Sequence, residues 1–135
     1  MKKIKTVLLV DDDEPTNFIN KKVIQGSGLV EAIHTAHSGQ EALSFLNRKN
    51  DQVDQIPVPD LIFLDINMPA MDGWEFLTRY KKLKNTPTEK IRIVMLTTSL
   101  NPDDEVKAKE IKEVHGYKSK PLTKQMIEEI ATSYF

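Results

Sequence analysis

A short apolar run that ends in a carboxylate stands in the middle of this sequence. Residues 61–64 (LIFL) lead directly into Asp65, after which the stretch breaks at Pro69 and turns at Gly73. An unbroken apolar run of this length, bounded by turn residues, is typical of a strand buried on both faces of a parallel sheet. Open α/β sheets bind ligands at the carboxyl ends of their strands, so Asp65 follows a strand at the point where a site is expected.

Four further segments have strand character. In chain order, the five candidate strands are residues 6–10, 30–36, 61–64, 91–96 and 115–120. The first is followed by Asp11, the fourth by Thr97, and the weak fifth ends at Lys120. The carboxyl ends of these strands therefore carry polar and charged residues rather than simple turn residues.

Helix signals separate the strands. Helix starts are indicated at Pro15, Ser38, Asp72, Asn101 and Thr123, where capping residues or a first-turn proline precede apolar residues at helical spacing. Strand and helix alternate five times, which indicates βαβ units around a parallel sheet. At 135 residues, the chain is most simply one domain with no second domain.

Two of these helices carry specific expectations. We expect the first to stop at Gly26 and Gly28 and the fourth to end at about Glu113. Apolar residues recur at helical spacing at Phe18, Ile19, Val23 and Ile24 in the first helix, and Val106 and Ile111 are expected to face inward in the fourth.

Composition excludes several classes of protein. Apolar residues make up 39% and charged residues 29%, with a net charge of −1, which suits a globular domain and gives no basic excess for nucleic acid or an anionic membrane. The chain has no cysteine, so it has neither disulfides nor thiolate metal ligands. The short apolar run at residues 7–10 does not suit a signal peptide. We expect a cytoplasmic protein without nucleic-acid or membrane partners.

The residues at the strand ends form a chemically coherent set. In a parallel sheet they converge, which brings together the carboxylates of Asp11, Asp12 and Asp65 with Thr97 and Lys120. Three close carboxylates repel one another unless a cation intervenes, and hard oxygen ligands favour Mg²⁺. A lysine and a hydroxyl are good partners for a phosphoryl group. The set predicts a site for Mg²⁺ and phosphate with one carboxylate free to act as a nucleophile.

Four blocks carry a family resemblance: LLVDDDEPT, DLIFLDINMPAMDG, IVMLTTS and GYKSKPLT. In order and spacing they resemble the receiver domain of two-component response regulators, over almost the whole chain. The closest likeness is to stand-alone, chemotaxis-regulator-like receivers without an output domain. The resemblance implies a flavodoxin-like (βα)5 fold, a doubly wound parallel sheet with strand order 2-1-3-4-5, and control by phosphorylation. A histidine kinase or a histidine phosphotransfer protein would be the donor, and the downstream partner would be another protein.

The resemblance also implies roles for the acidic residues. Asp65 would be the phosphoacceptor. Asp12 would bind Mg²⁺ directly, Asp11 would bind it mainly through water, and the backbone carbonyl of Asn67 would supply a further ligand. The third acid of the first run, Asp13, is better explained as a helix cap.

The remaining roles concern the phosphoryl group and the switch. By resemblance, Thr97 would hydrogen-bond a phosphoryl oxygen, Lys120 would pair with the phosphate, and Tyr117 would turn inward as Thr97 moves. Pro121 would follow a cis peptide bond. The sequence departs from the family at Thr98, where a small alanine or glycine is usual, so the rates of phosphorylation and hydrolysis are left open.

Two alternatives to a signalling switch use a similar fold or site. A haloacid-dehalogenase-like phosphohydrolase uses a similar set of groups, but its motif follows the first strand and would place Pro15 where threonine or valine is expected. A receiver that has lost phosphorylation and only binds partners would not need the complete set of site residues. We therefore expect a switch rather than an enzyme, and a monomer, with dimerisation through the last two βα units left open.

Overall fold

A five-stranded parallel sheet organises the computed structural model, which describes residues 3–47, 58–84, 86–98 and 100–135. The strands are β1 (Ile4–Val10), β2 (Val30–Ala36), β3 (Leu61–Asp65), β4 (Arg92–Thr97) and β5 (Val114–Ser119), and their order across the sheet is β2-β1-β3-β4-β5. All four neighbouring pairs are parallel. The strand order 2-1-3-4-5 is therefore confirmed, and with it the doubly wound, flavodoxin-like fold.

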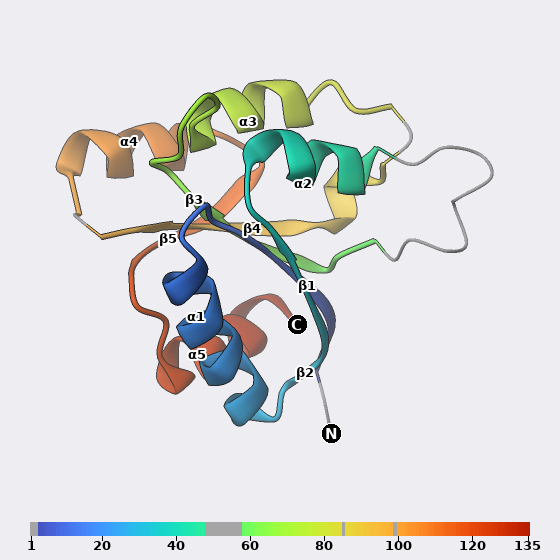
Figure 1. Ribbon diagram of the computed structural model, residues 1–135, viewed down its shortest axis with the longest axis vertical. Helices are drawn as coiled ribbons and strands as arrows, with labels where there is room; N and C mark the ends of the chain where they lie inside the picture. The colour runs from blue at the N-terminus through green and yellow to red at the C-terminus, as the bar shows by residue number, and fades with distance from the viewer. Residues whose placement is uncertain (1–2, 48–57, 85, 99) are drawn as a thin grey trace.

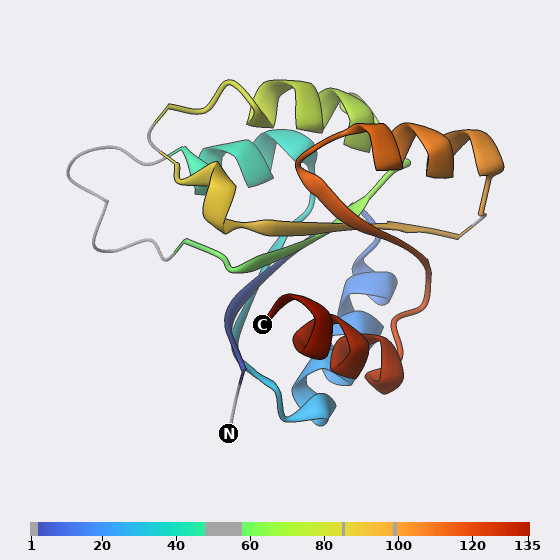
Figure 2. The ribbon, with the colours of Figure 1, turned by 180° about the vertical axis from the view of Figure 1, so that it is seen from behind.

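Helices cover both faces of this sheet (Figures 1 and 2). They are α1 (Glu14–Ser27), α2 (Gly39–Leu46), α3 (Gly73–Tyr80), α4 (Pro102–Glu110) and α5 (Lys124–Tyr134), with a short 3-10 turn at Thr88–Lys90. Helices α1 and α5 lie on one face, and α2, α3 and α4 lie on the other (Figure 1). None of the described helices is long and apolar enough to cross a membrane.

The apolar strands serve both layers because successive side chains point to opposite faces. In β1, Val7 and Leu9 belong to the core under α1 and α5, whereas Leu8 and Val10 belong to the core under the other three helices. All four are at most 1% exposed. This two-sided burial explains why the runs are continuously apolar rather than alternating.

The inner face of α1 differs from the apolar pattern. Phe18 is 63% exposed and Ile19 is 52% exposed, whereas the buried residues of the helix are Asn17, Asn20 and Ile24. Two amides therefore occupy positions where apolar side chains are usual, and both make hydrogen bonds to loops at the sheet edge. The helix runs through Gly26 and stops only at Gly28, which has a left-handed φ of 72°.

Helix α4 also differs from expectation. It ends at Glu110 rather than near Glu113, and Val106 is 57% exposed instead of facing inward. Ala108 is the buried residue of this helix, and Ile111, as expected, packs against the core just after it. The side of this strongly charged helix that faces the core is therefore marked by one small residue, Ala108.

The helix caps follow the sequence signals. The side chains of Asp13, Ser38, Asp72, Asn101 and Thr123 each accept a hydrogen bond from a backbone N–H in the first turn that follows. Asp13 and Asp72 are therefore confirmed as caps. The loop expected at residues 50–59 lies mostly outside the described residues, which resume at Val58.

Candidate functional site

The register of the sheet brings Asp11 and Asp65 to the same level. Val10 of β1 pairs with Leu64 of β3, so the next residue of each strand is an aspartate. One carboxylate oxygen each from Asp11, Asp12 and Asp65 lies within 4.8 Å of the other two. Asp11 and Asp65 are each 4% exposed, whereas Asp12 is open to solvent. The predicted convergence of these three acids is observed.

Lys120, which directly follows the edge strand β5, also belongs to this acidic cluster. Its Nζ atom lies 2.8 Å from Oδ2 of Asp11 and 3.1 Å from Oδ1 of Asp65, and its side chain is only 9% exposed. Its backbone N–H donates to the carbonyl of Thr97 over 2.7 Å, which fixes the chain after β5 against the end of β4. The Lys120-Pro121 peptide bond is cis, as expected.

The electrostatics of the cluster leave an excess of negative charge. Burial raises the pKa of Asp65, and the nearby charge of Asp11 raises it further, while Lys120 works in the opposite direction. Burial by itself would lower the pKa of Lys120, but its hydrogen bonds and ion pairs with Asp11 and Asp65 outweigh that effect and raise it. The cluster holds three carboxylates, and Lys120 pairs with two of them, so the oxygen donors fit a hard divalent cation.

Thr97 and Tyr117 lie on the neighbouring strands β4 and β5. Thr97 ends β4 and is 1% exposed. The half-buried Tyr117 of β5 accepts a hydrogen bond at its hydroxyl from the backbone N–H of Asn101, at the start of α4. Thr98 is exposed beside the site, and Ser99 lies outside the described residues. The bulk of Thr98 therefore faces solvent at the mouth of the site.

The loop after Asp65 is held by its backbone. The N–H of Gly73 donates to the carbonyl of Ile66 over 2.7 Å, which closes the turn before α3. Ala70 has a φ of 67°, a left-handed conformation that is unfavourable for a residue with a Cβ. Asn67, the expected source of a carbonyl ligand, is exposed in this loop two residues beyond Asp65.

The sequence interpretation did not single out Asn17 and Asn20. The Nδ2 of Asn17 donates to the backbone carbonyl of Asp11 over 2.8 Å. The Oδ1 of Asn20 accepts from the backbone N–H of Leu122 over 3.2 Å. A signal was available, because asparagine is a poor helix former and two of them three residues apart inside a helix share one face.

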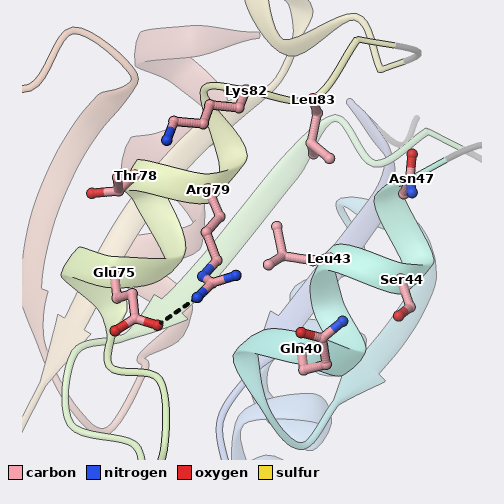
Figure 3. A pocket seen from close by; sticks show the side chains of 9 residues that line it. All are labelled: Gln40, Leu43, Ser44, Asn47, Glu75, Thr78, Arg79, Lys82 and Leu83. Carbon is pink, nitrogen blue, oxygen red and sulfur yellow. Dashed lines mark ion pairs between the residues drawn. The ribbon is translucent and has the colours of Figure 1, made fainter.

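The described residues also line cavities. One of about 560 Å³ lies between α2 and α3, where Glu75 pairs with Arg79 over 3.3 Å and Leu43 and Leu83 supply apolar surface (Figure 3). A smaller one of about 180 Å³ adjoins the cluster and is lined by Thr16, Ile19, Asn20, Thr98, Lys120 and Pro121. Of these two cavities, the smaller has Lys120 in its wall.

The fold and the site together define a doubly wound α/β domain with an acidic, lysine-containing pocket at the carboxyl edge of its sheet. The response regulator receiver domain family matches residues 7–132, and the chain belongs to this family. The predicted family is thereby confirmed. Receiver domains bind a divalent metal at an acidic pocket, and this chain has an acidic cluster formed by Asp11, Asp12 and Asp65.

Similar proteins agree with this assignment. The chain is 33% identical over 107 residues to response regulator Rcp1 of Synechocystis sp., a match that covers 79% of this chain and 71% of that protein. A crystal structure of a two-component response regulator from Cytophaga hutchinsonii superposes with a TM-score of 0.87 at 35% identity, covering 97% and 96% of the two chains. A Mn²⁺-bound form of Rcp1 superposes with a TM-score of 0.75 at 29% identity, covering 96% and 94%.

Proposed function

We propose that this receiver domain is a phosphorylation-controlled switch in which Asp65 accepts a phosphoryl group. The position of Lys120 is the observation that supports this most, because its Nζ lies within 3.1 Å of Asp65 and 2.8 Å of Asp11. An ammonium group held there by a buried carboxylate pair is available to neutralise charge that arrives on Asp65.

The chemical step is a transfer between two protein side chains. An Oδ atom of ionised Asp65 attacks the phosphorus of a phosphohistidine on a kinase or phosphotransfer protein. The new P–O bond forms as the P–N bond breaks, and the ring, which carries a proton on its other nitrogen, leaves as neutral imidazole with the electron pair of that bond. Lys120 pairs with the phosphoryl oxygens, and the Thr97 hydroxyl donates to one of them.

The metal site would use the same acidic cluster. The carboxylates of Asp11 and Asp12, one carboxylate oxygen of Asp65 and the backbone carbonyl of Asn67 would hold Mg²⁺. The ion, when bound, supplies positive charge that offsets repulsion between the carboxylates and the incoming phosphoryl group. Support comes from the 4.8 Å limit on the spacing of the three carboxylate oxygens and from the Mn²⁺-bound form of the related Rcp1.

The output of the switch would be read on the face formed by α4, β5 and α5. Thr97 moves toward the phosphoryl group, and the Tyr117 ring turns into the space behind it and gives up its hydrogen bond to Asn101. Leu100 is 59% exposed at the start of this face, and Val106 on α4 is 57% exposed, so apolar surface is available to a protein partner. We propose a shift between two populated states of one fold.

The phosphate donor would approach over α1. Phe18 and Ile19 are exposed on that helix, and Ile19 shares the wall of the 180 Å³ cavity with Lys120. A donor protein that covers these apolar residues brings its histidine to the edge of the sheet at which Asp65 lies. Within residues 1–135 we propose one receiver unit that acts by binding proteins and not by catalysing a reaction on a small substrate. We propose that it acts as a monomer, with dimerisation through its last two βα units left open.

Mass spectrometry of the intact protein tests this function. Wild-type protein, incubated with Mg²⁺ and acetyl phosphate, is expected to gain the mass of one phosphoryl group. Asp65→Asn removes the nucleophile and is expected to gain none, whereas Asp13→Asn keeps the α1 cap and is expected to behave as wild type. No increment in the wild type with any donor would contradict the switch, and many turnovers of phosphomonoester hydrolysis would favour a phosphohydrolase.

A further inference from the structure

Two buried asparagines replace the apolar residues expected on the inner face of α1. Asn17 is 5% exposed and Asn20 is 1% exposed, and they share their face with the fully buried Ile24. Burying an amide is unfavourable unless its polar atoms find hydrogen-bond partners. The chain also has Phe18 and Ile19 in the same helix, and both face solvent. The hydrogen-bond partners of the two amides therefore indicate why polar side chains occupy these buried positions.

Asn17 holds the peptide bond between the first two acids of the cluster. Its Nδ2 donates to the carbonyl of Asp11 over 2.8 Å, and that carbonyl belongs to the peptide plane that leads into Asp12. The side chain of Asp11 is fixed independently by the Asp13 N–H and by Lys120. Among the described residues, no hydrogen bond or ion pair holds the exposed Asp12 carboxylate, so its direction depends on this peptide plane.

The other polar atom of the Asn17 side chain argues against a purely structural role. Its Oδ1 is buried and has no hydrogen-bond partner among the residues that the structure describes. An apolar side chain of similar size would fill the same space without leaving a buried acceptor unpaired. The amide is thus placed at a free-energy cost, and the bond to the Asp11 carbonyl is what it provides.

Asn20 holds the backbone of the turn that follows Lys120. Its Oδ1 accepts from the N–H of Leu122 over 3.2 Å. Because Pro121 has no N–H, Leu122 carries the first backbone donor after Lys120. The bond therefore ties the turn that follows Lys120 to the same helix that holds the Asp11-Asp12 peptide.

We propose that Asn17 and Asn20 are positioning residues that use α1 to set the separation between the Asp12 carboxylate and the Lys120 ammonium. They lie one helical turn apart on the same face of α1 and reach two loops that are more than a hundred residues apart in the chain. This role rests on the proposed function, because it concerns the metal and phosphoryl site. Neither asparagine contacts the groups that react; Asn17 acts through the backbone carbonyl of Asp11, and Asn20 acts through the backbone N–H of Leu122, two residues after Lys120.

Binding of Mn²⁺ to the whole chain, measured by electron paramagnetic resonance of the free ion, tests the Asn17 half of the proposal. Asn17→Leu replaces the amide by an apolar residue of similar size, and Asn17→Ala is a second variant should the leucine not fit. Loss of a group that orients a metal ligand typically weakens metal binding by 10-fold or more, so we expect the Mn²⁺ dissociation constant to rise about 10-fold. Circular dichroism establishes that each variant is folded at the temperature used.

A matched control separates positioning from simple loss of a buried hydrogen bond. Thr86 is 7% exposed, and its hydroxyl donates to the carbonyl of Leu46 at the opposite edge of the sheet. Thr86→Val removes that bond with almost no change of shape and is expected to leave Mn²⁺ affinity unchanged. An unchanged affinity in folded Asn17→Leu and Asn17→Ala, or an equal loss in Thr86→Val, would overturn the role of Asn17.

Phosphoryl uptake from acetyl phosphate tests the Asn20 half. Asn20→Leu frees the turn after Lys120, so we expect uptake about 10-fold slower, with Mn²⁺ affinity within about twofold of wild type. Wild-type uptake rates in this variant would overturn the role of Asn20. Wild-type protein that binds Mn²⁺ but takes up no phosphoryl group would instead overturn the proposed function, while the Mn²⁺ measurement still decides the role of Asn17.

Discussion

The Tyr117 hydroxyl accepts a hydrogen bond from the backbone N–H of Asn101, with 3.2 Å between the two atoms. Asn101 caps α4, a nine-residue helix in which Ala108 is the buried residue. The helix has one buried residue, and the bond from β5 reaches the residue that caps it. The position of the Tyr117 side chain and the order of the start of α4 are therefore coupled.

Tyr117→Phe removes this bond and keeps the ring. We expect a loss of about 0.5–1.5 kcal/mol in the free energy of unfolding, the usual range for one hydrogen bond. We also expect faster hydrogen exchange at the Asn101 amide, because its acceptor is gone. Exchange measured by NMR at single amides, together with urea denaturation, checks both effects.

Tyr134→Phe is the control for this change. The Tyr134 hydroxyl also bonds to β5, where it donates to the carbonyl of His115, but it comes from α5. Its loss is expected to lower stability without changing exchange at Asn101. Equal acceleration at Asn101 in both variants would mean that α4 responds to general destabilisation and not to Tyr117.

Replacement of Asp65 by asparagine should make the fold more stable at neutral pH. Burial, followed by the charge of Asp11, raises the pKa of Asp65 above its ordinary value of 3.8. Because the pKa is higher in the folded than in the unfolded chain, ionisation of Asp65 favours unfolding. Wild-type protein therefore loses stability relative to Asp65→Asn as the pH rises through the folded pKa, and the two converge below about pH 3.8.

Thermal unfolding in the presence of EDTA between pH 3 and pH 8 checks this prediction. Glu128→Gln, which removes one negative charge from the exposed part of α5, is the control. Its difference from wild type should not follow the same pH dependence. A melting temperature of Asp65→Asn at or below that of wild type at pH 7 would contradict the electrostatic description of the cluster.

Added Mg²⁺ should reverse the charge penalty in wild-type protein. A ligand that binds only the folded state stabilises it by about 1.4 kcal/mol at ten times its dissociation constant. We expect this gain to be lost in Asp12→Asn, because Asp12 belongs to the acidic cluster. Asp13→Asn should keep the gain, since Asp13 caps α1 through Thr16 and asparagine caps equally well. Melting curves over a series of Mg²⁺ concentrations distinguish the two neighbouring acids.

Much of the site could be predicted because the topology of the sheet determines which residues meet at its edge. Once β1, β3 and β5 are parallel strands of one sheet, Asp11, Asp65 and Lys120 must meet at the same edge, whatever the details of the helices. The short apolar runs carry that information in a few residues each. In the first and third runs, the first polar residue after the apolar stretch, Asp11 or Asp65, is the one that belongs to the acidic cluster.

Side-chain direction in the helices could not be predicted in the same way. In α1, apolar spacing gives Phe18 and Ile19 a place in the pattern, yet hydrogen bonds of Asn17 and Asn20 to distant loops decide which face is buried. In α4, Ala108 rather than Val106 contacts the core. Both outcomes depend on partners far away in the chain, which local periodicity does not contain.

The close approach of Gly73 to the backbone of Asp65 yields a last prediction. A Cβ at Gly73 would lie 2.9 Å from the Asp65 carbonyl oxygen and 3.0 Å from Cα of Ile66, and neither atom can move without moving the loop that carries the acceptor. We expect Gly73→Ala to lower the free energy of unfolding by about 1–3 kcal/mol and to slow phosphoryl uptake.

At Gly39, the other glycine at the start of a helix, a Cβ would meet Sδ of Met71 at 2.6 Å. That sulfur belongs to a flexible side chain that can rotate away, so Gly39→Ala should lose much less stability and keep wild-type uptake. Urea denaturation and uptake from acetyl phosphate, measured on both variants, test the difference. Equal losses would mean that the loop after Asp65 is softer than its backbone contacts imply.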